Sequence, residues 1–198
     1  MTEAEWLACA DPHKMLEFLR DGASERKFWL FVAVCAREIR PFFQGLSNDQ
    51  EDAADLWERY ADGQVTELDV KRASRAAMNL SLEPPLPPPW RAARSGVFEV
   101  MFWFTPRGTT EYPRLCELLR DVFGNPFRLL TINPAWLTPT KVELAQAIYD
   151  DRAFDRMPEL ADALEKAGCD NAEILSHCRG PGPHVRGCWV VDLVLGKE

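Results

Sequence analysis

The residues best suited to chemistry gather near the end of the chain. They are Cys169, His177, Cys178, His184 and Cys188. Thiolate sulfur and imidazole nitrogen are preferred zinc ligands, so these five residues are the candidate ligands of a metal site. A helix that begins near Val185 would bring His184 close to Cys188.

The spacing of these residues also allows a structural interpretation without any cofactor. The region contains neither a CxxC pair nor an HxxxH pair. On a helix, the adjacent His177 and Cys178 would point about 100° apart, so only one of them would face a given ion. In this alternative Cys169 and Cys178 pack as small apolar side chains, and His177 caps the end of the preceding helix.

A cysteine nucleophile is a third interpretation of the same region. Cys188 follows Arg186 and would lie near a helix N-terminus, and both features lower the pKa of a thiol. His184 would then be the base and Asp192 the acid that orients it. The apolar stretch after Cys188 instead favours a buried cysteine. We therefore assign no catalytic residue and favour a protein that is not an enzyme. We expect no metal or cofactor, with zinc at the five residues above as the alternative. The candidate binding residues are His177, His184, Arg186 and Cys188.

The remaining sequence contains no established catalytic or phosphate-binding pattern. The stretch GPGPH places prolines where a phosphate loop needs backbone donors, and no GxSxG, HExxH, SxxK or EF-hand pattern occurs. His13 falls in the first turn of a predicted helix, where we expect it to be exposed.

The elements that position these residues are predicted to be helices nearly throughout. Apolar residues recur every three or four positions, and the sequence predicts about nine or ten short helices in an irregular all-α bundle. Thr2 with Glu5 forms one predicted capping box and Asp170 with Glu173 another. Asp11 followed by Pro12 predicts a helix start, and Gly124 predicts a helix end. The stretch ERKFWLFVAVCAREIRPFF predicts a central buried helix that Ser24 caps.

Two stretches fit either a helix or a strand. Residues 97–104 are rich in strand-forming residues, but their apolar side chains also share one helical face, and the length favours a helix. Residues 188–195 are strongly apolar and leave the same two alternatives open.

A proline-rich stretch predicts how the helices are grouped. Residues 83–89 contain five prolines, which cannot donate helical hydrogen bonds and favour an extended polyproline II segment. We predict a spacer here between an N-terminal helical half, residues 1–82, and a C-terminal half, residues 90–198. One continuous domain is the alternative.

Acidic side chains in the first half suggest a surface for a partner. Asp52, Asp55, Glu58 and Asp62 recur on one side of a predicted helix, opposite Leu56, Trp57 and Tyr60. We expect this acidic stripe to be exposed.

The composition limits the classes of partner. The 198 residues carry a formal net charge of −8, which disfavours nucleic acid and anionic lipid. The longest uncharged apolar run, Phe28 to Ala36, is too short to cross a bilayer, and the N-terminus does not resemble a signal peptide. We expect a cytoplasmic protein with six reduced cysteines.

Several stretches together resemble a large family of uncharacterised bacterial proteins. They are MTEAEWLACADPHKMLEFLRDGASERKFWLF and WERYADGQV in the first half, and LLRDVFGNPFRLLTINPAWLT and the tail from LADALEK through HVRGCWVVDLVLGKE in the second. The resemblance implies a mainly helical fold and carries no activity with it. The family often has adjacent cysteines before arginines in the first buried helix, whereas this chain has only Cys35 and Arg37 there.

The sequence thus leads to two functional hypotheses. The first is a helical module that binds or regulates another protein without catalysis, because the chain combines helices, an acidic stripe and many tryptophans. The second is a small zinc-binding or cysteine-dependent protein that uses the C-terminal histidines and cysteines.

Overall fold

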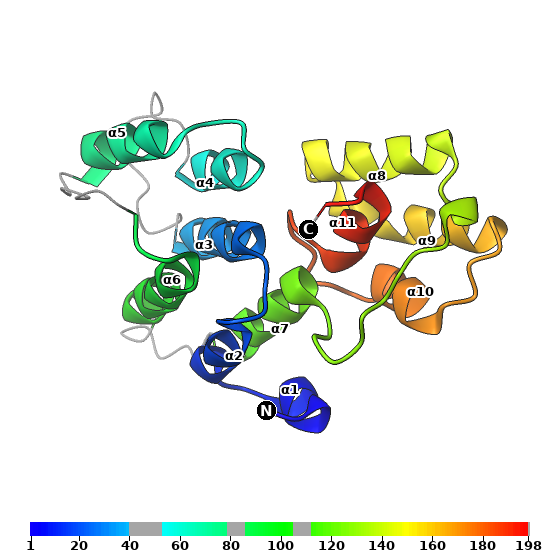
Figure 1. Ribbon diagram of the computed structural model, residues 1–198, viewed down its shortest axis with the longest axis horizontal. Coiled ribbons are helices and arrows are strands. Elements are labelled where there is room, and N and C mark those ends of the chain that lie inside the picture. Colours follow the sequence, from blue (N-terminus) through cyan, green and yellow to red (C-terminus); the bar gives the residue numbers. More distant parts are fainter. Residues whose placement is uncertain (40–52, 79–85, 105–111, 198) are drawn as a thin grey trace. The chain divides into compact units, whose positions relative to one another are not determined.

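The chain is helical throughout the part that the structure describes. The computed structural model describes residues 1–39, 53–78, 86–104 and 112–197 (Figure 1). These residues contain eleven α-helices, two short 3₁₀ helices and no strand, which confirms the predicted all-α fold. The α-helices are α1 (Glu3–Ala8), α2 (Pro12–Leu19), α3 (Glu25–Ile39), α4 (Ala53–Ala61), α5 (Glu67–Met78), α6 (Pro89–Phe104), α7 (Tyr112–Phe123), α8 (Pro139–Asp151), α9 (Met157–Lys166), α10 (Ala172–Arg179) and α11 (Trp189–Leu195).

The helices form two compact units. The first comprises Met1–Leu119 and the second Arg120–Glu198, so the boundary falls within α7. The predicted spacer at residues 83–89 does not coincide with this boundary. Its residues 83–85 lie outside the described part, and Pro89 already belongs to α6, which packs on α3 within the first unit.

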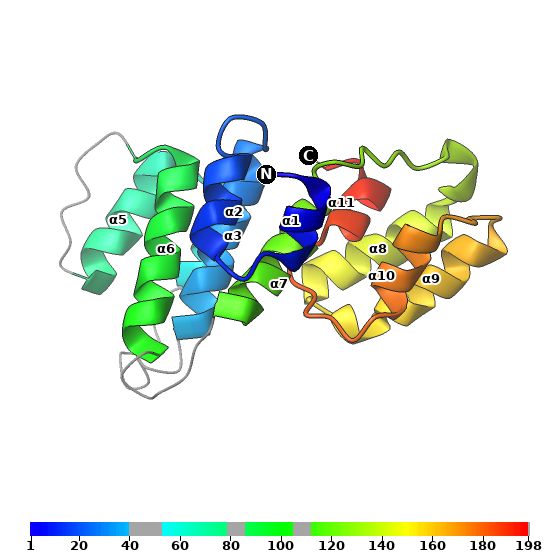
Figure 2. The same ribbon diagram turned by 90° about the horizontal axis from the view of Figure 1, so that it is seen from below.

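The first unit is built around α3. Its side chains at Phe28, Phe31 and Cys35 are buried at helical spacing, as predicted for a central helix. α6 and α4 pack against it, and α2 packs on α6 (Figure 2). Gly96 lies where α6 crosses α3, and a Cβ atom at this position would come within 2.9 Å of the Cβ atom of Cys35. The absence of a side chain at Gly96 therefore sets how closely these two helices approach.

The prediction that the acidic stripe is exposed is wrong. Glu58 and Asp62 are nearly fully buried, and they accept hydrogen bonds from Arg37 and Arg26 of α3 at 3.1 and 3.0 Å. Asp55 also pairs with Arg37, while Asp52 lies outside the described residues. Glu58 of α4 and Asp62 just after it are paired with arginines of α3 because burial without a partner would be costly for each of these two charges.

Most predicted helix ends agree with the structure. The capping box of Thr2 and Glu5, the start at Asp11–Pro12 and the left-handed Gly124 after α7 are all present. The capping box predicted for Asp170 is wrong, because Asn171 is the N-cap of α10 and its side chain accepts from the backbone of Glu173 and Ile174.

Both ambiguous stretches are helical. Residues 97–104 complete α6, and α11 begins directly after Cys188. In α6, Val97 and Val100 are buried while Phe98 between them is exposed, which is the pattern of a helix period and not of a strand. In α11, Val190, Val191 and Val194 are buried at helical spacing.

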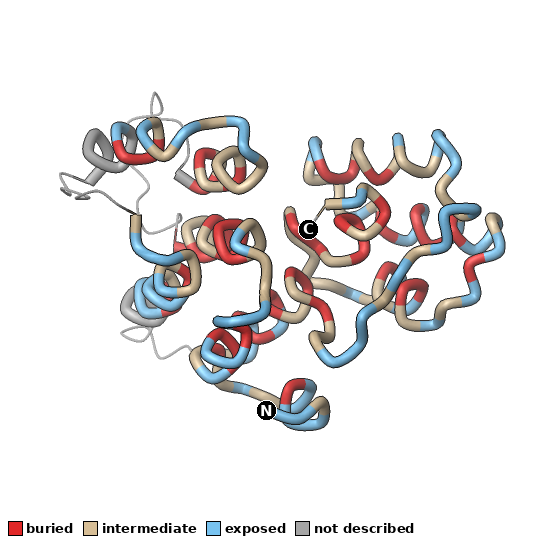
Figure 3. The backbone as a smooth tube through the Cα atoms, viewed as in Figure 1, coloured by how far each residue is buried: buried red, intermediate tan, exposed pale blue. Residues whose placement is uncertain are grey.

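The second unit places its apolar core between α8, α9, α10 and α11. α9 packs against both α8 and α10, and α11 packs against α8. The buried positions follow the inner sides of these helices (Figure 3). In the described residues no helix combines the length and apolarity needed to cross a membrane.

Candidate metal centre

Four side chains converge in the second unit. Asp121 lies in the last turn of α7, His177 in the last turn of α10, His184 in the segment after α10, and Cys188 at the N-cap of α11. One potential ligand atom from each lies within 4.8 Å of the others. We call these residues the four-residue cluster.

Asp121 is the centre of the hydrogen bonding in this cluster. Its Oδ2 accepts from the backbone N–H of Val185 at 2.9 Å, and its Oδ1 lies 2.9 Å from Nδ1 of His184 and 3.2 Å from Nε2 of His177. Burial raises the pKa of the Asp121 carboxyl, but its hydrogen bonds with the two histidines outweigh burial and hold this pKa below its usual value. The carboxylate therefore stays charged.

His177 presents one ring nitrogen to two partners. Its Nε2 lies 3.2 Å from the sulfur of Cys188 as well as 3.2 Å from Oδ1 of Asp121. The ring also packs against those of His184 and Trp189, with centroids 4.8 and 5.0 Å apart. The acid and the thiol thus meet at the same nitrogen.

Cys188 is fully buried beside this nitrogen. Burial raises the pKa of its thiol well above the ordinary value, and the charge of Asp121 raises it further. The backbone N–H groups of Val190 and Val191, at the start of α11, oppose this increase in part. Without a cation nearby, the sulfur stays protonated.

The second histidine has an unused ring nitrogen. The His184 side chain is 8% exposed, and its Nδ1 faces Asp121. Its Nε2 is buried and has no hydrogen-bond partner among the residues that the structure describes. When Nδ1 carries the proton, Nε2 holds a lone pair that no protein donor uses.

The turn between α10 and α11 brings these groups together through its glycines. Gly180 ends α10, and Gly182 has a φ of +82° with no room for a side chain, since a Cβ atom there would lie 3.0 Å from the backbone nitrogen of His184. The backbone N–H of Cys188 then donates to the carbonyl of Val185 at 2.9 Å. The chain therefore folds back sharply between His177 and Cys188.

The structure brings together three of the four predicted binding residues. His177, His184 and Cys188 meet, whereas the guanidinium of Arg186 lies over the ring of Tyr149 at 4.4 Å. Of the other predicted metal ligands, Cys169 and Cys178 belong to the buried apolar core of the second unit. This is the packing that the structural interpretation predicts for them.

Sequence reasoning missed Asp121. The carboxylate in contact with His184 belongs to this residue, whereas the sequence suggested Asp192, which is buried in α11. Asp121 stands among Leu118, Leu119 and Val122, all of them buried. An acid within the apolar face of a predicted helix was the signal that could have identified it.

No family model, curated protein or solved structure matches this chain. The family resemblance noted in the sequence stays a prediction.

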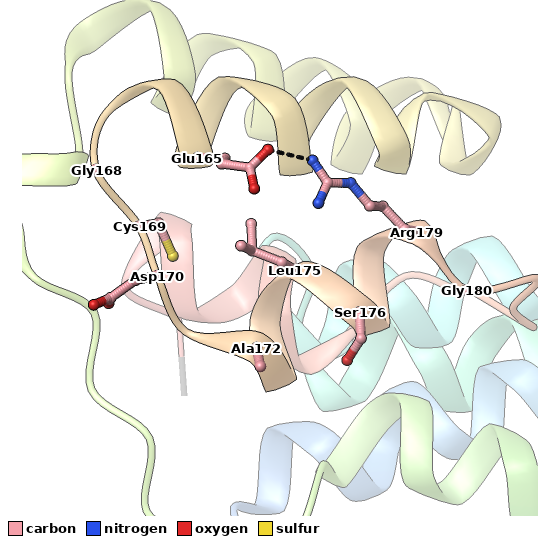
Figure 4. A pocket seen from close by; sticks show the side chains of 9 residues that line it. All are labelled: Glu165, Gly168, Cys169, Asp170, Ala172, Leu175, Ser176, Arg179 and Gly180. Carbon is pink, nitrogen blue, oxygen red and sulfur yellow. Dashed lines mark hydrogen bonds and ion pairs between the residues drawn. The ribbon is translucent and has the colours of Figure 1, made fainter.

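An open pocket lies elsewhere in the second unit, between α9 and α10. Figure 4 shows Arg179 reaching across it to Glu165, with 2.7 Å between their charged atoms, and Arg179 also pairs with Asp162 at 2.7 Å. Ala172 and Leu175 supply apolar surface to the pocket. None of the four cluster residues lines it.

Proposed function

We propose that this chain is a zinc-binding protein and that Asp121, His177, His184 and Cys188 hold the ion. The observation that carries the proposal is the shared nitrogen of His177, which lies 3.2 Å from both the carboxylate and the sulfur. Atoms of an acid, an imidazole and a thiol that all face one point are arranged as ligands around an ion.

The same observation argues against a cysteine nucleophile. In a triad, the base faces the nucleophile with one ring nitrogen, and the acid holds the other nitrogen. Here Asp121 and Cys188 contact the same nitrogen of His177. The thiol is also buried and protonated, whereas a reactive cysteine is a partly exposed thiolate.

The distances in the cluster suit a tetrahedral ion. Zinc bonds of about 2.0–2.3 Å place neighbouring ligand atoms about 3.3–3.6 Å apart. The closest pairs in the cluster are 2.9–3.2 Å apart and the widest lie within 4.8 Å, so an ion would move the closest ligands apart by a few tenths of an ångström and draw the widest pair together by about an ångström. Sulfur and imidazole favour zinc over magnesium or calcium, which take oxygen ligands.

The proposed ion has a structural role. Four protein ligands fill the tetrahedral positions, and closed sites of this kind stabilise a fold, whereas catalytic sites keep one position open. The ion would tie the end of α7 to α10 and α11. Its charge would also deprotonate Cys188, so zinc uptake would release a proton.

Elemental analysis of purified protein tests the proposal. We expect about one zinc ion per chain, retained by Cys178→Ala and lost by Cys188→Ala. Cys178 is the matched control because it is equally buried but packs in the apolar core. Wild-type protein without stoichiometric metal, or equal loss in the two variants, would contradict the proposal.

A second candidate function is binding of a protein partner at the pocket between α9 and α10. The pocket combines apolar surface from Ala172 and Leu175 with charged groups at Glu165 and Arg179, a mixture found in protein interfaces. We expect Ser176→Trp, which places a bulky ring in the pocket, to abolish capture of a specific partner while the fold is unchanged. A partner that binds wild type and Ser176→Trp equally would show that the interaction lies outside this pocket.

The cytoplasm is the compartment that suits this proposal. The six cysteines are thiols and not disulfides, and a reducing environment keeps thiols available for zinc. The net charge of −8 favours a protein partner over nucleic acid.

A further inference from the structure

His177 is the most exposed side chain of the four-residue cluster. Cys188 is fully buried, and the side chains of Asp121 and His184 are 2% and 8% exposed. The side chain of His177 is 21% exposed. A molecule that approaches the cluster from water therefore meets His177 first.

The less exposed members are also held by groups outside the cluster. Asp121 accepts from the backbone of Val185, and Cys188 is part of the first turn of α11, where its carbonyl accepts from the backbone of Asp192. His184 follows the tight turn at Gly182. Rotation of Asp121 would break its hydrogen bond with Val185, and rotation of His184 or Cys188 would have to displace neighbouring buried groups.

His177 is held differently. Its hydrogen-bonding contacts join it to Asp121 and Cys188, and its remaining ring contacts are with His184 and Trp189. It lies in the last turn of α10, where its carbonyl accepts from Gly180 at 3.2 Å. Side-chain rotation at a helix end leaves the helical hydrogen bonds intact, so His177 is the ligand that leaves most easily.

We infer that His177 is a displaceable ligand, and that the ion accepts an imidazole from outside the chain when His177 withdraws. This inference rests on the proposed zinc site. One nitrogen–zinc bond breaks and another forms, with no change of oxidation state, while Asp121, His184 and Cys188 retain the ion. An imidazole from outside the chain matches the departing side chain of His177 in size and donor atom. A histidine on another protein carries this group, which extends the site from fold stabilisation to recognition.

Imidazole rescue tests the inference, with cobalt(II) in place of zinc so that sulfur ligation is visible in the absorption spectrum. We expect His177→Ala to weaken cobalt affinity at least about tenfold, and millimolar imidazole to restore most of this loss. His184→Ala is the matched control, because its buried position leaves no path for imidazole, and we expect no rescue. Far-UV circular dichroism establishes that both variants fold.

A second measurement uses the wild-type protein and needs no variant. The rate at which zinc passes to a strong chelator should rise with imidazole concentration, because imidazole takes the place of His177 in a transient intermediate. Three results would overturn the inference alone, provided that wild type binds metal. They are no rescue of His177→Ala, equal rescue of both variants, and a transfer rate that does not depend on imidazole. Failure of wild type to bind either metal would overturn the zinc site as well.

Discussion

At the scale of single residues, Asp121 determines the character of the cluster. It is a buried carboxylate whose two oxygens contact His177 of α10 and His184 and Val185 of the segment after α10, and the backbone N–H of Val185 fixes its orientation. Asparagine would fill the same volume without the charge. The residue therefore supplies a negative charge that matters most when a cation is present.

We predict that Asp121→Asn weakens zinc binding by about 10- to 100-fold. The loss arises because the neutral amide is a poorer ligand for zinc and orients the histidines less firmly. Competition with a chromogenic chelator measures the change. Asp170→Asn, an exposed acid in the same unit, is the control, and unchanged affinity in Asp121→Asn would remove this residue from the ligand set.

His13 is a second residue whose surroundings differ from those predicted. The sequence suggested an exposed side chain, but both ring nitrogens are buried without hydrogen-bond partners in the described part of the chain, and the ring lies 4.5 Å from that of Phe98. Burial lowers the pKa of His13; Asp11 opposes this shift and Arg94 adds to it. The folded protein therefore favours the neutral ring.

This lowered pKa predicts a pH dependence of stability. The unfolded chain takes up a proton near pH 6.5, before the folded chain does, so His13 supports folding fully above that pH and progressively less as pH falls toward its folded pKa. We expect urea unfolding to show a larger loss of stability between about pH 6.5 and 5 in wild type than in His13→Leu. Parallel pH profiles would contradict the prediction.

Residue types alone identified three members of the cluster and missed the fourth. His177, His184 and Cys188 lie within twelve residues of one another, so composition draws attention to them. Asp121 is far away in the sequence and reaches them only because α7 ends beside the turn. Helical periodicity describes each helix separately and contains no information about which helix ends meet.

At the scale of elements, the junction of α7 and α11 depends on a residue without a side chain. Gly124 has a φ of +66°, which favours glycine, and a Cβ atom there would lie 3.2 Å from Cγ of Trp189. Gly63 after α4 has a similar φ of +69° with nothing within 4 Å of such an atom. A comparison of the two positions therefore distinguishes the cost of a left-handed backbone from the cost of crowding against Trp189.

We predict that Gly124→Ala destabilises the protein more than Gly63→Ala. Both variants carry the left-handed backbone penalty of about 1–2 kcal/mol, and crowding against Trp189 adds about 1–3 kcal/mol at Gly124 alone. Equilibrium urea unfolding compares them. Equal losses would mean that Trp189 moves aside without cost.

The positions of the helices were easier to predict from the sequence than which of their side chains are exposed. Capping residues and periodicity predicted most helices because these signals act within a few residues. The acidic stripe was misread because Arg26 and Arg37, which neutralise Asp62 and Glu58, belong to a different helix. Charge pattern on one helix does not reveal the arginines that a neighbouring helix presents to it.

At the scale of the whole molecule, the chain contains two compact units, and each has buried apolar residues. The proposed ion lies entirely among residues of the second unit, Arg120–Glu198. Ligands that bind only folded protein stabilise the part that forms their site. Metal should therefore affect the two units differently.

We predict that zinc protects the second unit selectively from hydrogen exchange. Zinc at about 1,000 times its dissociation constant adds about 4 kcal/mol to the stability of the unit that binds it. Exchange measured by mass spectrometry should slow in peptides covering α10 and α11 and remain unchanged in α3. Equal protection of α3 would show that both units unfold together.

The ring of Trp189 beside His177 gives the site its own optical reporter. With the two centroids 5.0 Å apart, the indole senses whether the imidazole is bound to metal. Zinc should change the fluorescence of wild-type protein, and the change should disappear in Trp189→Phe although six other tryptophans remain. The packing of Trp189 on His177 therefore allows metal binding to be followed by intrinsic fluorescence, without any added dye.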